Sequence, residues 1–310
     1  GNYILMMFYT TVSGWMLRYF FDTAKGDFVN ADTNAVQSHF SNMNAIPSEM
    51  IFWTTLVIIV GFLVCSLGLQ NGVEKISKVM MIALLVIMVV LAINSIFLEG
   101  AGKGLYFYLV PDFEQIKKIG LINVIVAAMN QAFFTLSIGM GSMTIFGSYL
   151  GKDHSLLGES INIVALDTFV AIVSGLIIFP TCFAFGVSPD QGPKLIFVTL
   201  PNIFAKMPGG RIWGSCFFIF MAFAAFSTVI AVFENIMSSC MDLWKWSRKK
   251  TAIINAIIIT VTSIPCVLGF NVWSGFMPFG KNTNVMDLED FLISNLILPI
   301  GSLIYTLFCT

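Results

Sequence analysis

The chain has 310 residues, of which 57% are hydrophobic and only 11% are charged, and its formal net charge is −1. A composition this apolar, with long apolar runs throughout, excludes an ordinary water-soluble domain and indicates an integral membrane protein. The nearly balanced charge offers no basic surface, so we expect no nucleic-acid partner.

Eight apolar segments are long enough to be membrane-spanning helices, and polar, glycine-bearing or proline-bearing connections separate them. They cover residues 3–21, 50–69, 77–98, 120–150, 160–186, 211–241, 252–270 and 286–309. An apolar piece within 187–210 is too short and too closely bounded by prolines to span, so we expect a re-entrant or capping hairpin there. Both ends of the chain lie in apolar sequence, which predicts one transmembrane domain over 1–310, truncated at both ends.

Basic residues indicate which side of the membrane each connection faces. The short connections after the second, fourth and sixth segments are rich in them, at Lys75, Lys78, Lys152, Lys245, Arg248, Lys249 and Lys250. A high density of basic residues in short loops marks the cytoplasmic side. We therefore expect residues 22–48, 99–119 and 187–210 to be extracellular loops of a multi-pass protein of the plasma (inner) membrane.

The middle of the fourth segment, with the sequence NQAFFTLSIGMG, is poorly suited to an unbroken helix. Gly139 and Gly141 lie two residues apart, and the hydroxyls of Thr135 and Ser137 can bond the local backbone instead of the helical ladder. In a membrane, freed peptide groups persist only inside protein or beside a wet cavity. We interpret this stretch as a broken helix beside a site for a polar substrate or cation. The alternative is a continuous helix whose glycines allow close packing.

Two carboxylates lie inside predicted spans. Asp167, in the fifth segment, has apolar neighbours for about a turn on either side. A buried acid needs a cation, donors or a proton, so we predict a cation-linked or proton-linked site; the alternative is a neutral acid hydrogen-bonded to another helix. Glu234, nearer the cytoplasmic end of the sixth segment, is expected to snorkel or to be structural.

Polar side chains also share helix faces in two spans. Ala224, Ser227 and Thr228 are spaced i, i+3 and i+4, so a carbonyl beside a small side chain and two hydroxyls form an oxygen-bearing surface suited to Na⁺. The alternative is that the hydroxyls join helices. Leu5 and Tyr9 likewise share a face, and the phenol either faces a cavity or is packed with its hydroxyl satisfied.

Several longer motifs occur in order along the chain: GVEKISKVMM, VPDFEQIKK, QAFFTLSIGMGSMTIFGSYL, IFVTLPNIFAKMPGG and DFLISN. On these motifs the chain closely resembles the neurotransmitter:sodium symporter family, nearest to its prokaryotic LeuT-like sodium-dependent amino-acid transporters. The resemblance covers essentially the whole chain. It implies an all-α LeuT-like inverted-repeat fold with a discontinuous central helix, of which this chain holds the third to tenth of twelve helices.

The resemblance also implies roles for individual residues. Substrate would be bound by Leu5, Tyr9, Phe134, Thr135, Ser137, Met140, Val229 and Val232. Of these, Phe134 would close over the substrate as an aromatic lid, Tyr9 would hydrogen-bond its carboxylate, and the apolar members would face its side chain.

Two sodium sites are implied in the same way. Thr135 would contribute oxygen to the first site, together with the substrate carboxylate, and Ala224, Ser227 and Thr228 to the second. Asp167 aligns with a position where animal members carry Asn and need chloride nearby, so a built-in negative charge implies that chloride is not required.

Gate residues follow from the resemblance too. Tyr149 and Asp242 match the cytoplasmic gate, and Asp290 matches the outer acidic gate. In both cases the gate residue follows a predicted sodium ligand by 14 residues, Tyr149 after Thr135 and Asp242 after Thr228. At the helical rise of about 1.5 Å per residue this is about 21 Å, the distance from the middle of the membrane to its inner rim. The basic gate partners and the remaining sodium ligands belong to the family's first helix, which this sequence is expected to lack.

The expected function is sodium-coupled symport of a neutral, hydrophobic or aromatic amino acid by alternating access, with lipid, sodium and substrate as partners and a homodimer as one option. Two alternatives remain: a proton-coupled carrier of the same fold that uses Asp167, and a family member that binds ligand without transporting it. An enzyme is not expected, because no nucleophile–base pair or metal cluster accompanies the acids.

Overall fold

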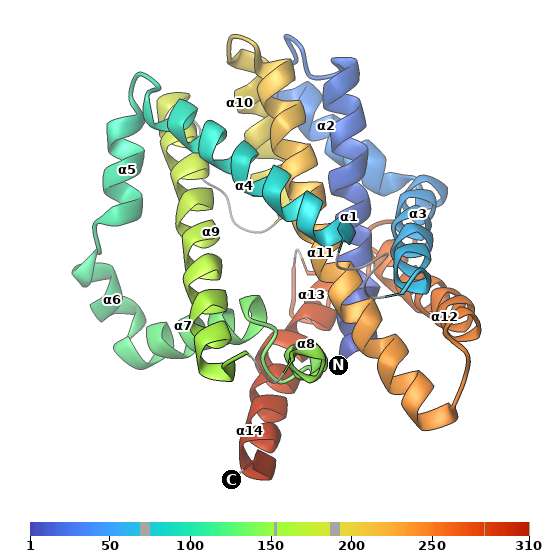
Figure 1. Cartoon of the computed structure of the whole chain (residues 1–310). Coiled ribbons are helices and arrows are strands. Elements are labelled where there is room, and N and C mark those ends of the chain that lie inside the picture. Colours follow the sequence, from blue (N-terminus) through green and yellow to red (C-terminus); the bar gives the residue numbers. More distant parts are fainter. Residues whose placement is uncertain (69–74, 152–153, 187–192, 282, 310) are drawn as a thin grey trace.

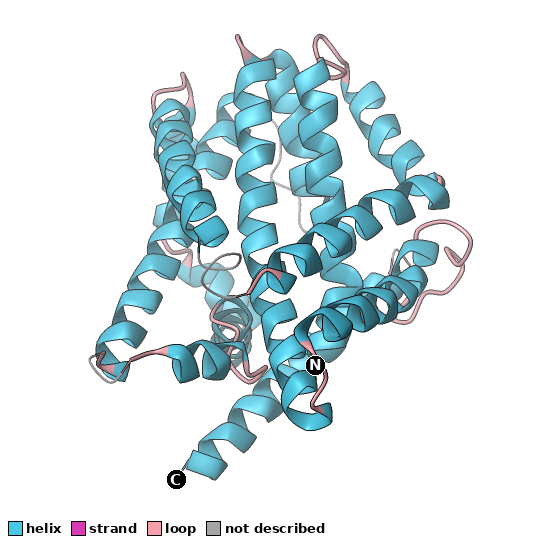
Figure 2. Cartoon of the chain, turned by 45° about the vertical axis from the view of Figure 1, so that its right-hand side comes forward, coloured by secondary structure: helices cyan, strands magenta, loops and turns pink. Residues whose placement is uncertain are grey.

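The computed structural model describes residues 1–68, 75–151, 154–186, 193–281 and 283–309, and throughout these ranges the secondary structure is helical (Figures 1 and 2). The elements are α1 (Asn2–Lys25), α2 (Thr33–Ala45), α3 (Pro47–Ser66), α4 (Lys75–Ile96), α5 (Ala101–Leu109), α6 (Phe113–Ile119), α7 (Leu121–Thr135), α8 (Ser142–Tyr149), α9 (Leu156–Ala184), η2 (Leu195–Thr199), α10 (Leu200–Lys206), α11 (Gly210–Trp244), α12 (Arg248–Gly269), α13 (Val285–Phe291), η3 (Leu292–Ile297) and α14 (Leu298–Cys309). Lys152, which contributed to the orientation prediction, lies outside the described residues.

Six of the described helical spans are long and apolar enough to cross a membrane, and the bent pair α6 and α7 makes a seventh if it is one span. Each of the eight predicted segments contains helix, so the all-helical membrane architecture is confirmed. The fourth is divided into α7 and α8, and the eighth runs through α13, η3 and α14 with a π-helical turn in its middle.

The first predicted segment, α1, is 24 residues long but falls short of the apolarity of the other spans. Its polar side chains are accommodated because it packs against α3, α11, α12 and α13. Thr10, Thr11 and Ser13 are buried, and each donates to the carbonyl four residues earlier. A helix that is covered by other helices does not need an apolar surface on every side. Hydropathy alone therefore fails to identify α1 as a membrane span.

The connections expected as extracellular loops contain short helices. Within 22–48, Asp32 caps α2 by accepting from the Ala35 amide, and within 99–119, Asp112 caps α6 in the same way. Asp and Asn at such positions satisfy the free amides of a first turn, so these connections are more ordered than loops.

The apolar piece between α9 and α11 is a short helix, Leu195–Lys206, and not a span. Its side chains Phe197, Leu200 and Ile203 are essentially fully buried. Trp15 and Tyr19 of α1 both meet Phe197 in edge-on ring contacts at 5.5 Å and 5.0 Å between centroids. This segment therefore closes over one end of α1, in agreement with the capping role expected from its length.

A buried ion pair joins the far end of α11 to α12. Arg248 donates from Nη2 to the carboxylate of Glu234, which is fully buried. Its Nε donates to the Cys65 carbonyl oxygen at 2.7 Å. Because Cys65 belongs to α3, one guanidinium connects three helices. Glu234 is thus structural and does not snorkel.

Candidate functional site

The fourth predicted span is broken where the sequence indicated. α7 ends at Thr135, α8 begins at Ser142, and between them Ser137, Gly139 and Gly141 have φ values of 52°, 88° and 86°. These left-handed conformations reverse the chain and release peptide groups from the helical ladder. The interpretation as a continuous helix is therefore wrong.

Asparagine side chains from two other helices bind the freed backbone. The carbonyl oxygen of Met140 accepts from Asn2 Nδ2 at 3.1 Å and from Asn235 Nδ2 at 2.9 Å. Asn2 opens α1 and Asn235 lies in α11, so the break is fixed to both helices. Satisfying a buried carbonyl in this way removes the main penalty of a non-helical stretch in the membrane.

The non-helical stretch between α7 and α8 also packs directly against the backbone of α14. A Cβ added to Gly139 would lie 2.5 Å from the carbonyl oxygen of Leu298 and 2.7 Å from the amide of Ser302, and one added to Gly301 would overlap the Gly139 carbonyl. Glycine at both positions therefore allows two backbones to meet.

Oxygen atoms gather on one face of α11. The carbonyl oxygen of Ala224 accepts from Ser227 Oγ at 2.8 Å and from Thr228 Oγ1 at 3.5 Å, as the i, i+3, i+4 spacing predicted. The side chain of Thr228 also lies near the Tyr9 side chain on α1. A carbonyl and two hydroxyls are the hard-oxygen donor set that an alkali cation takes, so these residues fit a sodium ion as cargo.

A second pair of oxygens lies at the end of α7. Thr135 Oγ1 donates to Asp167 Oδ1 of α9 at 2.7 Å. The acid of the fifth segment is thus hydrogen-bonded to a residue at the helix break. The hydrogen bond joins the predicted ligand of the first sodium ion to the acid that was predicted to form a cation-linked or proton-linked site.

The predicted apolar pocket residues belong to the main hydrophobic core. Leu5, Met140, Val229 and Val232 are at least nine-tenths buried, and Phe134 is half-buried against the same cluster. Ser137 is half-buried within the break. The core therefore brings side chains of α1, α11 and the α7–α8 break into one apolar region.

A cavity of about 410 Å³ lies between α7 and the α13–η3 segment. Phe134, the predicted lid, and Asp290, the predicted outer gate, both line it. Ser294 Oγ donates to Asp290 Oδ1 at 2.8 Å, and Asn130 Nδ2 donates to Asn295 Oδ1 at 3.2 Å across the cavity. The lid and outer-gate candidates thus share a polar-walled space.

The two cytoplasmic gate candidates lie at helix ends. Asp242 is exposed in the last turn of α11, and Tyr149 is the last residue of α8. The side chain of Tyr149 lies outside the described residues, so the structure leaves this gate as a prediction.

A model described as the sodium:neurotransmitter symporter family matches residues 22–279 of the chain. The chain belongs to this family. The family consists of symporters, so the expectation that the protein is not an enzyme is confirmed at the level of the family.

Curated relatives are similar along nearly the whole of this symporter-family chain. The uncharacterized sodium-dependent transporter YhdH of Bacillus subtilis is 32% identical over 99% of this chain and 66% of its own length. An uncharacterized sodium-dependent transporter of Haemophilus influenzae is 29% identical over 98% of this chain and 66% of its own length. The chain therefore spans slightly less than two thirds of the length of these relatives.

A solved structure has the same fold. The crystal structure of MhsT in complex with L-phenylalanine superposes with a TM-score of 0.90 and 37% identity, over 99% of this chain and 69% of that one. The LeuT-like fold, the family and the multi-pass membrane architecture are thus confirmed. The roles assigned to individual residues stay predictions.

Some site residues carried no prediction. Asn235 and Asn2 bind the Met140 carbonyl, and Asn130 and Asn295 line the cavity and hydrogen-bond to each other. Asn235 could have been found, since an amide within an apolar span has to meet a partner. Asn130 and Asn295 lie in apolar spans too and so also required partners, but that they pair with each other follows from how two distant segments pack.

Proposed function

We propose that the full-length protein is a sodium-coupled symporter of a neutral, hydrophobic or aromatic amino acid, acting by alternating access in the plasma (inner) membrane. The observation that carries this proposal is the oxygen-bearing face of Ala224, Ser227 and Thr228 on α11, which lies near the Tyr9 side chain of α1. It places a phenol suited to a substrate carboxylate beside an oxygen-bearing face suited to sodium.

Each residue then has a chemical task. Ala224, Ser227 and Thr228 provide oxygens for one sodium ion, and Thr135 contributes oxygen to the other, whose shell the substrate carboxylate completes. When one ion and the substrate share a bond, each increases the affinity of the other by the same factor. This reciprocity is the physical basis of coupling.

The substrate class follows from the walls of the pocket. The predicted pocket residues Leu5, Val229 and Val232 are apolar and buried in the core, and Met140 adds a flexible thioether that adapts to different shapes. The similar protein MhsT was crystallised with L-phenylalanine. We infer a substrate with an uncharged, apolar side chain.

Access to the site would alternate between two sides. Phe134 and Asp290 line one cavity and would close the outer side, whereas Tyr149 and Asp242 would close the cytoplasmic side. With this orientation the connections 22–48, 99–119 and 187–210 are extracellular. A rocking bundle around a fixed midplane site is the usual way in which such folds move.

The test is binding of radiolabelled leucine, phenylalanine and tryptophan to the purified full-length protein, with Na⁺ or K⁺ as the sole cation. We expect binding that requires Na⁺, that is lost in Thr228→Val and that is retained in Thr228→Ser, which keeps the hydroxyl. Uptake into proteoliposomes under a sodium gradient then separates transport from binding.

Three results would contradict the proposal. Binding that is indifferent to Na⁺ but driven by pH would indicate the proton-coupled carrier. Binding without uptake would indicate a family member that does not transport. Binding unaffected by Thr228→Val would remove the second sodium site from its assigned place.

A further inference from the structure

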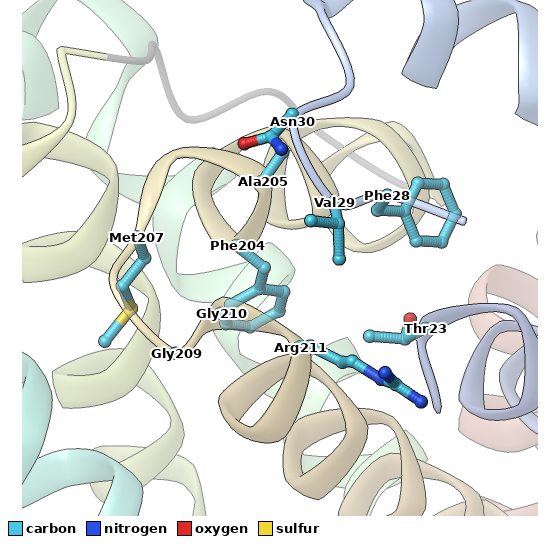
Figure 3. Close-up of a pocket in the computed structure, with 10 residues that line it drawn as sticks. All are labelled: Thr23, Phe28, Val29, Asn30, Phe204, Ala205, Met207, Gly209, Gly210 and Arg211. Carbon is cyan, nitrogen blue, oxygen red and sulfur yellow. The ribbon is translucent and has the colours of Figure 1, made fainter. Parts of the chain in front are cut away.

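A second cavity, of about 420 Å³, lies away from the helix break, where the C-terminal end of α1 meets α10 and the beginning of α11 (Figure 3). Its lining comes from the last turn of α1, the segment after it, the end of α10 and the first turn of α11. None of the substrate, sodium or gate candidates contributes to it. Its volume is within the range of small-molecule sites.

A buried hydroxyl without a partner lines this cavity. Thr23 is only 2% exposed, and its Oγ1 finds no hydrogen-bond partner among the described residues. The buried aliphatic hydroxyls of α1 at Thr10, Thr11 and Ser13 bond helix carbonyls, whereas the Tyr19 hydroxyl, like Thr23 Oγ1, has no partner among the described residues. A buried polar atom left unpaired costs about 1–3 kcal/mol, so a ligand that completes the bond is favoured.

The orientation of Thr23 is fixed by packing. A Cβ on Gly214 would lie 2.8 Å from Thr23 Cγ2, so the methyl group is pressed against α11. The hydroxyl, which shares the same Cβ, is therefore directed away from this contact. In Figure 3, Thr23 lies on the same side of the cavity as Phe28, with Arg211 along the adjacent edge.

The cavity also has a cationic edge. Arg211 donates from Nε at 2.9 Å and Nη2 at 2.5 Å to the carbonyl oxygen of Ala24, which holds the guanidinium in place. A guanidinium has five N–H donors, so others are left for a ligand. The other arginines, Arg18 and Arg248, pair with Asp22 and Glu234, whereas no described carboxylate pairs with Arg211.

The beginning of α11 adds to the attraction for a negative group. Gly209, Gly210 and Arg211 open this 35-residue helix and line the cavity. The aligned peptide dipoles give a helix N-terminus partial positive charge. Gly210 is required there, because a side chain would overlap the carbonyl of Phe204.

The rest of the wall is apolar. Phe28 and Phe204 are buried, and Val29 and Met207 complete this side of the cavity. A bare inorganic anion would leave this surface unused, and a neutral apolar molecule would leave the guanidinium and the hydroxyl unused. An organic acid with one apolar group satisfies both.

We propose that this cavity is a second binding site, for a small organic carboxylate with a single apolar group. Its carboxylate would accept from Thr23 Oγ1 and Arg211, and its apolar part would lie against Phe28 and Phe204. Because the ligand would contact α1, α10 and α11 together, binding would hold these three elements to one another. The proposal is independent of what the central site transports.

The test is isothermal titration of the purified full-length protein with 3-phenylpropionate, in a potassium buffer without sodium. The control ligand is 3-phenylpropionamide, which has the same shape and no charge. We expect saturable binding of the acid and at least about tenfold weaker binding of the amide.

Variants locate the binding. Thr23→Val keeps the shape but removes the hydroxyl, and Arg211→Met keeps an apolar stem but removes the charge; each is expected to weaken binding at least about tenfold. Thr23→Ser and the remote exposed Lys103→Met are expected to bind as the native protein does. Arg211→Met changes an exposed side chain, so it tests the site even if Thr23→Val fails to fold.

The proposal is overturned by an absence of saturable binding, by equal binding of acid and amide, or by binding that survives both Thr23→Val and Arg211→Met. Binding lost in Thr228→Val but retained in those two variants would place the ligand at the central site and would also overturn it.

Discussion

Thr135 at the end of α7 donates its hydroxyl hydrogen to Asp167 of α9, with 2.7 Å between the oxygen atoms. Two segments separated by a helix break and a connection are thereby joined where the first sodium ion is proposed to bind. We propose that the Asp167 carboxylate supplies a negative charge here, in the role that chloride is expected to have in family members with Asn at this position.

This contact leads to a prediction about chloride. Native uptake is expected to be unchanged when gluconate replaces chloride. Asp167→Asn keeps an oxygen acceptor for Thr135 but removes the charge, so we expect uptake that falls at least about tenfold and becomes chloride-dependent, since about 1.4 kcal/mol suffices for that factor. Uptake is measured in proteoliposomes with each anion.

Asp112→Asn is the matched control, because Asn is as good a helix cap as Asp and α6 is remote from the break. Strong chloride dependence of the native protein would remove the idea of a built-in charge.

The second prediction concerns the phenol on α1. Tyr9→Phe removes the hydroxyl proposed to bind the substrate carboxylate while keeping the ring. Because a hydrogen bond to a charged group contributes about 1.5–3 kcal/mol, substrate affinity should fall by about ten- to 150-fold. Radioligand binding at saturating sodium measures this.

Tyr106→Phe, at an exposed position of α5, should leave affinity unchanged. If Tyr9→Phe binds substrate as tightly as the native protein, the phenol does not hold the carboxylate.

The helix break could be predicted from the sequence. Thr135, Ser137, Gly139 and Gly141 indicated it, because hydroxyls and glycines close together in an apolar span favour a departure from the helical ladder. The structure ends one helix at Thr135 and begins the next at Ser142. Periodicity likewise placed Ala224, Ser227 and Thr228 on one face. Local patterns of this kind depend only on helix geometry.

Contacts between distant segments could not be derived in this way. The partner of Asp167, the two amides on the Met140 carbonyl and the pair of Glu234 with Arg248 all depend on how helices pack. Sequence showed that a buried acid needs a partner but not which residue would provide it. The resemblance to the symporter family implied roles for individual residues, and the structure shows which residues from other helices contact them.

The third prediction tests the substrate pocket. Met140 is 8% exposed at the centre of the break, and only its carbonyl is engaged by the two amides. Replacing its side chain by the bulkier Phe should reduce the affinity for phenylalanine and tryptophan more than for leucine, because less volume remains. Competition of the three amino acids against one radioligand gives the ratios.

Met143→Phe, in α8 at a more exposed position, is the control for added bulk. A selectivity that Met140→Phe leaves unchanged would contradict the assignment of this residue to the pocket.

The fourth prediction concerns stability. Arg248→Met would leave the fully buried Glu234 carboxylate without its guanidinium and the Cys65 carbonyl without its donor. Breaking one side of a buried ion pair typically destabilises a protein by about 3–5 kcal/mol, so a marked fall in thermal midpoint is expected.

Glu234→Gln combined with Arg248→Met should recover part of the loss, since the buried charge is then removed as well. Lys249→Met, the exposed neighbour, should have little effect. A double variant as unstable as Arg248→Met alone would show that the buried charge is not the cause.

The fifth prediction uses the contact between the break and α14. Gly139→Ala would place a methyl group 2.5 Å from the Leu298 carbonyl oxygen in a backbone conformation that side chains rarely adopt. The two backbones would have to separate, so both thermal stability and uptake should fall, uptake by at least about tenfold. Gly147→Ala in α8 meets nothing within 4 Å and is expected to be neutral or slightly stabilising. If Gly139→Ala transports like Gly147→Ala, the close approach of α14 is not needed for function, and the break is held by its asparagine contacts alone.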